Sequence, residues 1–203
     1  MEPGDHWREV YAARRPDEVS WFQASPLPSL DALARIGAKP SQSLVDIGGG
    51  ASALVDALLD RGWHDLTVVD IAAPALAASQ ARLGPRAEAV VWEAADIRSW
   101  SPGRSFDLWH DRAAFHFLTD AADRAAYRRA LDEGTHAGSH VIIATFALDG
   151  LDKCSGLPVR RYDAEAMAAE LGRDFTLVAH WHEAHLTPWS TEQRFQWAIF
   201  RRG

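Results

Sequence analysis

The chain has 203 residues, and its 21 Lys and Arg against 28 Asp and Glu give a formal net charge of −7. With 24% charged and 47% hydrophobic residues, it has the composition of a soluble globular protein, and a strongly disordered chain is excluded. The acidic balance argues against duplex nucleic acid as the main partner, because phosphate binding needs a basic surface. The single cysteine, Cys154, excludes an intrachain disulfide and a cysteine-based zinc cage. We expect a cytoplasmic protein without a membrane anchor, because no apolar run approaches the roughly 20 residues of a membrane span and Met1–Tyr11 has no hydrophobic signal core.

The N-terminal segment is aromatic. Trp7 and Tyr11 lie at helical spacing, which predicts a short helix. The loop 23–29, with two prolines, separates this segment from the rest. The apolar spacing of residues 30–36 indicates a second short helix.

From Ser43 onward, apolar runs alternate with helical patterns. The predicted strands are residues 43–47, 66–69, 89–92, 106–110 and 141–145. The predicted helices between them are residues 51–61, 73–82 and 120–134. This alternation predicts a parallel sheet with helices on both faces. A helix over 163–171, with Asp163 as its N-cap, precedes two consecutive strands, 175–182 and 194–201, which are most easily joined as an antiparallel hairpin.

The strongest local signal is a glycine-rich loop after the first predicted strand. Gly48, Gly49 and Gly50 follow Ile47, and a helix is expected to open near residue 51. Glycines let the backbone turn sharply and approach a ligand closely, and the helix N-terminus offers free N–H groups. The spacing of Gly48, Gly50 and Ala53 also satisfies the dinucleotide-binding fingerprint. A dinucleotide site and a tight turn without a ligand both stay open on this motif alone.

Three acidic residues sharpen the interpretation. Asp70 ends the second predicted strand about 20 residues beyond the glycines, where a carboxylate can accept from both hydroxyls of a ribose. Asp96 follows the third strand at the same edge of the sheet and can accept from an exocyclic amine, while Ile71 and Ile97 can sandwich a flat base. Asp46 lies within the end of an apolar strand, where a charge is expensive unless it is paired. A cationic ligand group, such as an amino-acid ammonium, would pair with it.

These residues resemble the class I S-adenosylmethionine-dependent methyltransferases. Asp46-Ile-Gly48-Gly-Gly50-Ala-Ser52 is similar to their first motif, Val69-Asp70-Ile71 to their ribose-binding acid and Ala95-Asp96-Ile97 to their adenine-proximal motif. Over about residues 44–201, the resemblance implies a Rossmann-like, seven-stranded, mostly parallel sheet with helices on both faces and an antiparallel last strand. It implies S-adenosyl-L-methionine as the cofactor. The implied contacts are Asp46, Gly48, Gly49, Gly50, Ser52, Asp70, Ile71, Asp96 and Ile97.

A finer resemblance concerns the acceptor. The segment 107–114, with Asp111 and Arg112, is similar to the fourth motif of thiopurine-type methyltransferases. The N-terminal aromatic residues are similar to a group that includes bacterial small-molecule and eukaryotic lysine methyltransferases, but the lysine enzymes usually carry an acid-lysine-glycine sequence where this chain has Asp111, Arg112 and Ala113. We expect a small-molecule acceptor, with sulfur slightly favoured and nitrogen and oxygen open.

We expect a single methyltransferase domain over 1–203, with residues 1–29 as the N-terminal helix and aromatic lid segment and 30–203 as the cofactor-binding core. Trp21 can close over the cofactor, or it can simply pack the short helix. The candidate catalytic residues are Asp111, His116 and Arg112, because they follow the fourth strand, where the transferred methyl group would lie. A histidine can act as a base near neutral pH, and Arg112 can steer an anionic or planar substrate. Asp111 and Arg112 can instead form an internal ion pair.

Other interpretations remain open. Protein-lysine methylation, an NAD-dependent oxidoreductase using the same glycine loop, and a non-catalytic cofactor-binding module all fit parts of the sequence. His180, His182 and His185 suggest a metal site, but structural or substrate-wall histidines are favoured and no metal is expected. Trp189 can line the acceptor pocket, and Cys154 is expected to be a bystander thiol. We expect a monomer or a homodimer.

Overall fold

The computed structural model describes residues 3–13 and 18–203, so residues 1–2 and 14–17 of the predicted lid segment lie outside the described residues. The α-helices are α1 (Pro3–Ala13), α2 (Leu27–Arg35), α3 (Leu54–Leu59), α4 (Ala73–Leu83), α5 (Ala121–Glu133) and α6 (Ala164–Leu171), with short 3-10 helices η2 (Gly84–Ala89) and η3 (Phe115–Phe117). The strands are β1 (Leu44–Ile47), β2 (Leu66–Asp70), β3 (Val90–Ala94), β4 (Phe106–Arg112), β5 (Thr135–Phe146), β6 (Lys153–Cys154), β7 (Leu157–Pro158), β8 (Phe175–Leu186) and β9 (Glu192–Arg202).

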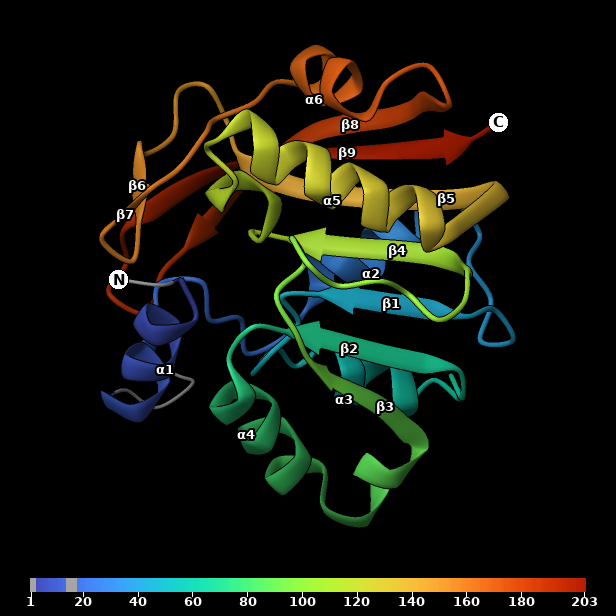
Figure 1. Ribbon diagram of the computed structural model, residues 1–203. Helices are drawn as coiled ribbons and strands as arrows, with labels where there is room; N and C mark the ends of the chain where they lie inside the picture. The colour runs from blue at the N-terminus through green and yellow to red at the C-terminus, as the bar shows by residue number, and fades with distance from the viewer. Residues whose placement is uncertain (1–2, 14–17) are drawn as a thin grey trace.

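Seven strands form one sheet in the order β3-β2-β1-β4-β5-β9-β8. Strands β1 to β5 pair in parallel, and β9 is antiparallel to both of its neighbours, β5 and β8. The predicted Rossmann-like sheet, the terminal hairpin and the antiparallel last strand are therefore confirmed. The strand order reverses between β1 and β4, which is where ligands of open α/β sheets bind. The arrowheads of β1, β2 and β4 point toward the side of the sheet where α1 lies (Figure 1).

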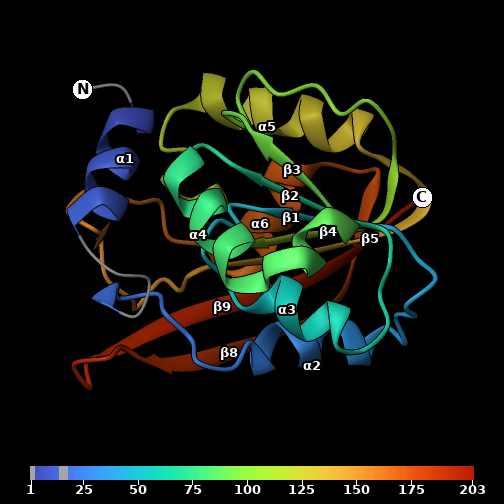
Figure 2. The same ribbon diagram turned by 90° about the horizontal axis from the view of Figure 1, so that it is seen from below.

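The sheet is buried between two layers of helices (Figure 2). Side chains of α2, α3 and α4 pack with one face of the sheet, and side chains of α5 and α6 pack with the other. The period-two alternation of a strand distributes neighbouring residues between these layers. In β4, for example, Leu108 belongs to the first core and Trp109 to the second. A sheet covered on both faces explains why its strands are nearly continuous apolar runs.

Several local features differ from the prediction; helix α2, for example, begins at Leu27, inside the predicted loop 23–29. The helix after the glycines begins at Leu54 rather than near residue 51, because residues 51–53 continue the loop and the Ser52 hydroxyl accepts from the Leu54 N–H at 3.0 Å. The two-residue strands β6 and β7 form a small hairpin that the sequence pattern did not indicate, since runs this short carry no detectable period.

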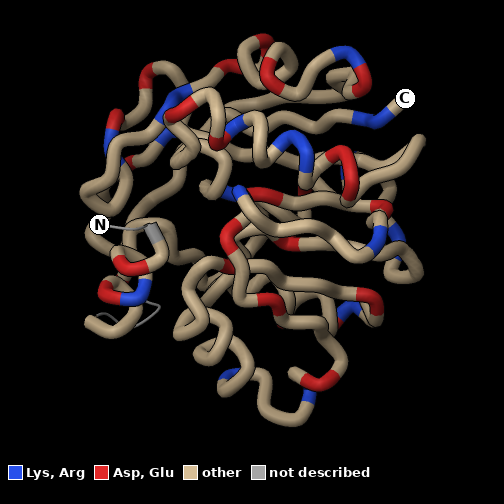
Figure 3. Tube along the Cα trace, in the orientation of Figure 1, with Lys and Arg blue, Asp and Glu red and all other residues tan. Residues whose placement is uncertain are grey.

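The N-terminal segment and the terminal hairpin meet at the carboxyl edge of the sheet. His185 Nε2 donates to the Ser20 carbonyl at 2.9 Å, and Gln23 Nε2 donates to Glu183 Oε1 at 3.2 Å. Acidic and basic residues are mixed along the whole chain (Figure 3). Within residues 3–13 and 18–203, no helix has the length and apolar character needed to cross a membrane.

Candidate active site

Two adjoining cavities lie at the carboxyl edge of the parallel strands. The first, of about 160 Å³, is walled by the ends of β1, β2 and β4, the segment after β3, and aromatic residues of α1. The second, of about 60 Å³, lies over the glycine loop. The cavities share Tyr11, Trp21, Gly48 and Arg112 as wall residues. The predicted glycine loop, strand-end acids and aromatic segment therefore come together in space.

The three glycines are each required by their surroundings. Gly48 has a φ of +69°, which disfavours any side chain, and a Cβ there would lie 2.8 Å from Ala114 Cβ. A Cβ on Gly49 would overlap the Asp46 carboxylate. A Cβ on Gly50 would lie 2.5 Å from Asp70 Oδ2. The loop thus packs directly on the two carboxylates that the sequence associates with a ligand.

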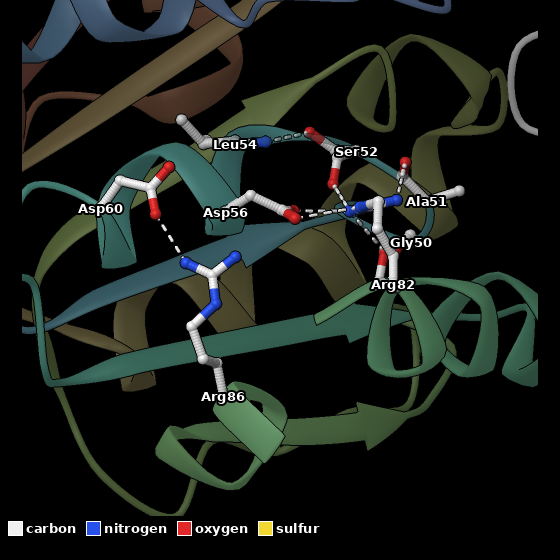
Figure 4. A network of polar contacts seen from close by, with 9 residues as sticks. Gly50, Ala51, Ser52, Leu54, Asp56, Asp60, Arg82 and Arg86 are labelled. Carbon is white, nitrogen blue, oxygen red and sulfur yellow. Dashed lines mark hydrogen bonds and ion pairs between the residues drawn. The ribbon is translucent and has the colours of Figure 1, made fainter. Parts of the chain in front are cut away.

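Side chains of helix α4 donate hydrogen bonds to the backbone of the glycine loop (Figure 4). The Arg82 guanidinium donates to the Ser52 carbonyl at 2.7 Å and forms an ion pair with Asp56 at 2.7 Å. The Ser79 hydroxyl donates to the Gly50 carbonyl at 2.7 Å. The sequence interpretation missed Arg82 and Ser79, because both act through a helix that follows the next strand.

Asp70 lies at the floor of the first cavity, with only 8% of its surface exposed. Its Oδ1 accepts from the Ala72 N–H at 2.7 Å. Burial raises the pKa of Asp70 to about 6, although hydrogen bonds from the Ala72 and Gly50 backbone oppose the rise. Burial, and then the Asp70 charge, also raises the pKa of Tyr11. A buried carboxylate with free acceptor capacity suits a ligand that brings hydroxyl donors.

Asp46 is held by a chain of buried hydrogen bonds. The β1–β4 register places it beside His110, and its Oδ1 lies 2.7 Å from His110 Nδ1. His110 Nε2 lies 2.9 Å from the Ser29 hydroxyl. Since a carboxylate only accepts, His110 Nδ1 donates to Asp46 Oδ1. These contacts hold the Asp46 side chain at the wall of the second cavity, with its Oδ2 against Gly49.

Asp96 also lines the first cavity, where it forms an ion pair with Arg98. The Arg98 side chain donates to its Oδ2 at 2.5 Å, and the Arg98 N–H donates to its Oδ1 at 2.9 Å. The pKa of Asp96 is lowered overall. Partial burial acts to raise this pKa, but the hydrogen bonds and the charge of Arg98 outweigh burial. Ile71 and Ile97 line the same cavity, as expected for walls of a flat base.

Trp21 forms part of the roof of both cavities. Its ring packs edge-on against Trp7, with centroids 5.5 Å apart, and against Tyr11 at 6.3 Å. Trp7 in turn packs on Phe117 at 5.0 Å. This aromatic layer covers the site and also packs α1 onto the core, so both expectations for Trp21 fit the geometry.

Asp111 does not reach either cavity, contrary to its selection as a catalytic candidate. It is fully buried on the α5 side of the sheet, where it accepts from the Ala114 and Phe115 N–H groups at 2.9 and 3.1 Å and from the Tyr127 hydroxyl at 2.9 Å. Burial raises the pKa of Asp111 to about 6. The hydrogen bonds and the nearby His110 act in the opposite direction but do not outweigh burial. Asp111 holds the turn after β4.

His116, the candidate base, does not line either cavity. It is fully buried outside both cavities, and its Nδ1 accepts from the Phe146 N–H at 3.3 Å. Burial, followed by the Arg112 charge, lowers the pKa of His116 to about 3. The ring is therefore neutral across the physiological range and has no access to a substrate.

Arg112 is the candidate that does line both cavities. It does not pair with Asp111, because consecutive strand residues point to opposite faces. Its Nη1 donates to the Trp21 carbonyl at 3.1 Å, and its Cζ lies 4.8 Å from the centre of the Phe195 ring. Its Nε and Nη2 are buried and have no hydrogen-bond partner among residues 3–13 and 18–203. Burial lowers the pKa of Arg112. Burial of a guanidinium without an ion pair costs several kcal/mol.

The remaining sequence candidates lie as follows. Cys154 lines the first cavity, and burial raises the pKa of its thiol to about 12. Trp189 is 57% exposed and lies outside both cavities, so it is not an acceptor wall here. His180 and His182 are exposed on one face of β8. Within the described part of the chain, no cluster of three His, Cys, Asp or Glu side chains is placed to hold a metal.

Residues 44–134 match the sequence model of a methyltransferase domain. No curated protein matches the chain in sequence. Among solved structures, the N-methyltransferase NodS from Bradyrhizobium japonicum WM9 in complex with S-adenosylhomocysteine is 20% identical, with a TM-score of 0.72 over 98% of this chain and 99% of that one.

Two further structures share the fold. A protein of echinomycin biosynthesis, concerned with conversion of a disulfide bond into a thioacetal group, is 18% identical, with a TM-score of 0.77 over 98% of this chain and 91% of that one. The 1,6-didemethyltoxoflavin-N1-methyltransferase of Burkholderia thailandensis is 18% identical, with a TM-score of 0.68 over 96% of this chain and 81% of that one. The matched domain contains the glycine loop and both strand-end acids. With the seven-stranded fold, it makes this chain similar to the class I S-adenosylmethionine-dependent methyltransferases.

Proposed function

We propose that the protein transfers the methyl group of S-adenosylmethionine to a small-molecule acceptor, a thiolate or an unprotonated amine, without a side-chain general base. The observation that carries this proposal is the composition of the first cavity beyond the glycine loop and the strand-end acids. Asp123 also lines this cavity, where it pairs with Arg98. The other lining residues beyond the loop and the strand-end acids include Trp7, Trp21, Phe117, Leu118, Arg112 and Cys154. Their apolar surfaces suit a compact organic molecule.

None of these side chains can remove a proton near neutral pH. Arg112 is a cation, and the Cys154 thiol is protonated because its pKa is raised to about 12. Asp111 and His116 are enclosed elsewhere. The acceptor must therefore be nucleophilic on its own, as a thiolate or a neutral amine is. The protein contributes proximity, alignment and exclusion of water.

The residues present fit the cofactor. Asp46, held by His110, would bind its ammonium, Asp70 would accept from its ribose hydroxyls, and Ile71 with Ile97 would flank its adenine. The crowded glycines would let the backbone approach it closely. When bound, S-adenosylmethionine supplies an activated methyl group on a sulfonium.

Two observations bear on the acceptor atom and on the alternatives. NodS and the toxoflavin enzyme are named as N-methyltransferases, and the echinomycin protein is associated with sulfur chemistry. Nitrogen and sulfur acceptors are therefore both compatible with this fold. The Arg112 cation at the cavity wall disfavours a protein lysine, whose own ammonium it would repel.

The test is a screen of small thiols and amines with isotopically labelled cofactor, followed by pH profiles of kcat. Two aliphatic thiols of different pKa, both above about 8, are compared at saturating cofactor. We expect the inflection of each profile to follow the pKa of its thiol, and the Asp70→Asn variant to lose cofactor binding. One common inflection for both thiols would reveal an enzyme base and contradict the proposal.

A further inference from the structure

Three hydrogen-bonded side chains, Asp46, His110 and Ser29, lie together beside the glycine loop. Their exposed fractions are 4%, 3% and 1%. Polar groups buried this deeply destabilise a fold unless they have hydrogen-bond partners. The contacts join residues that are 64 and 81 positions apart in the chain. All three residues also line the second cavity, so they border the space over the loop.

The sheet brings Asp46 and His110 together. In the β1–β4 register the two residues are directly opposite, and side chains of opposite residues on neighbouring strands share one face. That face is the one covered by α2 and α3, because Leu44 and Leu108, two residues before each of them, belong to the core on that side. The contact therefore follows from strand register and does not depend on a loop.

Two neighbours hold the His110 ring. Its Nε2 lies 2.9 Å from the hydroxyl of Ser29, in the first turn of α2. The ring of Trp197 packs against it, with centroids 6.3 Å apart and planes tilted by 46°. A ring held in this way directs Nδ1 at Asp46 Oδ1, at 2.7 Å.

The contact with His110 leaves the second oxygen of Asp46 for a ligand. An unrestrained carboxylate turns easily about its last bond, because such torsions are broad and two-fold. With Oδ1 taken by His110, Oδ2 lies against Gly49, where the missing Cβ leaves room. No residue in 3–13 or 18–203 donates a hydrogen bond to Oδ2, and Oδ2 is not among the partnerless polar atoms that are sealed from solvent. Oδ2 is thus an acceptor that is open at the wall of the second cavity.

We infer that His110, supported by Ser29, is a positioning residue that holds the Asp46 carboxylate with Oδ2 toward the ammonium of the cofactor. The inference rests on the proposed function, and it gives a role in cofactor binding to two residues outside the glycine loop and the strand-end acids. The rival assignment is direct contact of the His110 ring with the cofactor carboxylate, because the ring borders the same cavity. The two assignments differ in which group of the cofactor depends on His110.

Three ligands that share one adenosine part separate these roles in calorimetric titrations of the full-length protein. S-adenosylhomocysteine carries both the ammonium and the carboxylate. Its decarboxylated analogue, 5′-(aminopropylthio)adenosine, carries the ammonium alone, and 5′-methylthioadenosine carries neither. We expect His110→Leu to weaken binding of the two amine-bearing ligands about tenfold or more, the effect of losing a hydrogen bond to a charged group, and to leave 5′-methylthioadenosine unchanged. His110→Asn, whose amide N–H can replace that of Nδ1, should restore both affinities to within about threefold of wild type.

A second histidine–aspartate pair supplies the matched control. His136 Nε2 lies 3.3 Å from Asp107 Oδ1, near the start of β4 and outside both cavities. His136→Leu should leave all three affinities unchanged. If His110→Leu does not fold, Ser29→Ala takes its place and should weaken the two amine-bearing ligands about threefold, with 5′-methylthioadenosine unchanged.

Each other pattern of binding contradicts the inference. Weaker binding of S-adenosylhomocysteine alone would assign His110 to the cofactor carboxylate. Equal weakening of all three ligands would leave His110 with a role in folding only, and a His110→Asn variant that binds as weakly as His110→Leu would show that the N–H contact is not responsible. A wild type that binds 5′-methylthioadenosine as tightly as S-adenosylhomocysteine also overturns the inference. A wild type that binds none of the three ligands refutes the proposed function itself, and the inference with it.

Discussion

Asp70 is expected to weaken the fold at neutral pH, and replacing it with asparagine tests this directly. Its ordinary pKa of 3.8 is raised to about 6 in the folded protein. At about 1.4 kcal/mol per pH unit, the difference corresponds to a cost of roughly 3 kcal/mol for keeping Asp70 ionised in the native state. Between pH 3.8 and about 6 the native state binds one proton more than the unfolded state, so the stability falls as the pH rises and the full cost is present above pH 6.

Asparagine has nearly the same shape but no charge to desolvate. Its amide oxygen can still accept from the Ala72 N–H, although this hydrogen bond becomes weaker than one to a carboxylate. We therefore expect Asp70→Asn to raise the free energy of unfolding by about 1–3 kcal/mol at pH 8, and the gain to vanish near pH 4. The same change should weaken S-adenosylhomocysteine binding roughly a hundredfold, because two ribose hydroxyls lose a charged acceptor.

Urea unfolding of wild type and Asp70→Asn at intervals between pH 4 and 8 measures this difference. Asp111 also has a pKa raised to about 6. Because wild type and Asp70→Asn both contain Asp111, its contribution to the pH dependence of stability cancels in the difference between them. Asp60→Asn, at an acid that is 62% exposed, serves as the matched control and should change neither stability nor binding appreciably. If Asp70→Asn is less stable than wild type at pH 8, or if the difference does not change with pH, the argument from burial is refuted.

Three further predictions concern the glycine loop, the Trp21 ring that lines both cavities, and the turn after β4. Gly49→Ala places a methyl group on the Asp46 carboxylate and should weaken S-adenosylhomocysteine binding at least tenfold by calorimetry, while Gly103→Ala, which meets nothing within 4 Å, should leave binding unchanged. Trp21→Ala should raise the Kd of S-adenosylhomocysteine; a lower melting temperature at unchanged Kd would show that the ring serves packing alone. Asp111→Asn should lower the melting temperature and leave kcat of the folded protein within a few-fold; a large loss of kcat at unchanged melting temperature would restore Asp111 as a catalytic residue.

Features that depend on short stretches of chain could be predicted from the sequence. Asp163 caps α6 as expected, with its side chain accepting from the Ala166 N–H at 2.8 Å. The glycine loop and the strand-end acids meet at one edge because parallel strands place their carboxyl ends together. The hydrogen-bond chain from Asp46 to Ser29 could not be predicted from the sequence. It depends on the register of β1 against β4 and on how α2 packs against the sheet.

The placement of Asp111 away from the cavities has a specific origin. The predicted strand ended at His110, whereas β4 continues to Arg112. Had the strand been extended by two residues, its alternation would have placed Asp111 and Arg112 on opposite faces and excluded an ion pair between them. The burial of His116 could not be predicted for a different reason, because burial within the 3-10 turn after β4 leaves no trace in the residue pattern.

The contacts of Ser20 and Gln23 with His185 and Glu183 join residues 165 and 160 positions apart. On the ribosome, Ser20 and Gln23 emerge well before their partners on β8. At roughly 5–20 residues per second, the interval is on the order of ten seconds. During that time the N-terminal segment lacks these two contacts, although Arg112 and Phe117 are already available to it. The wall of the site that joins the two ends of the chain is therefore completed only after synthesis of the terminal hairpin.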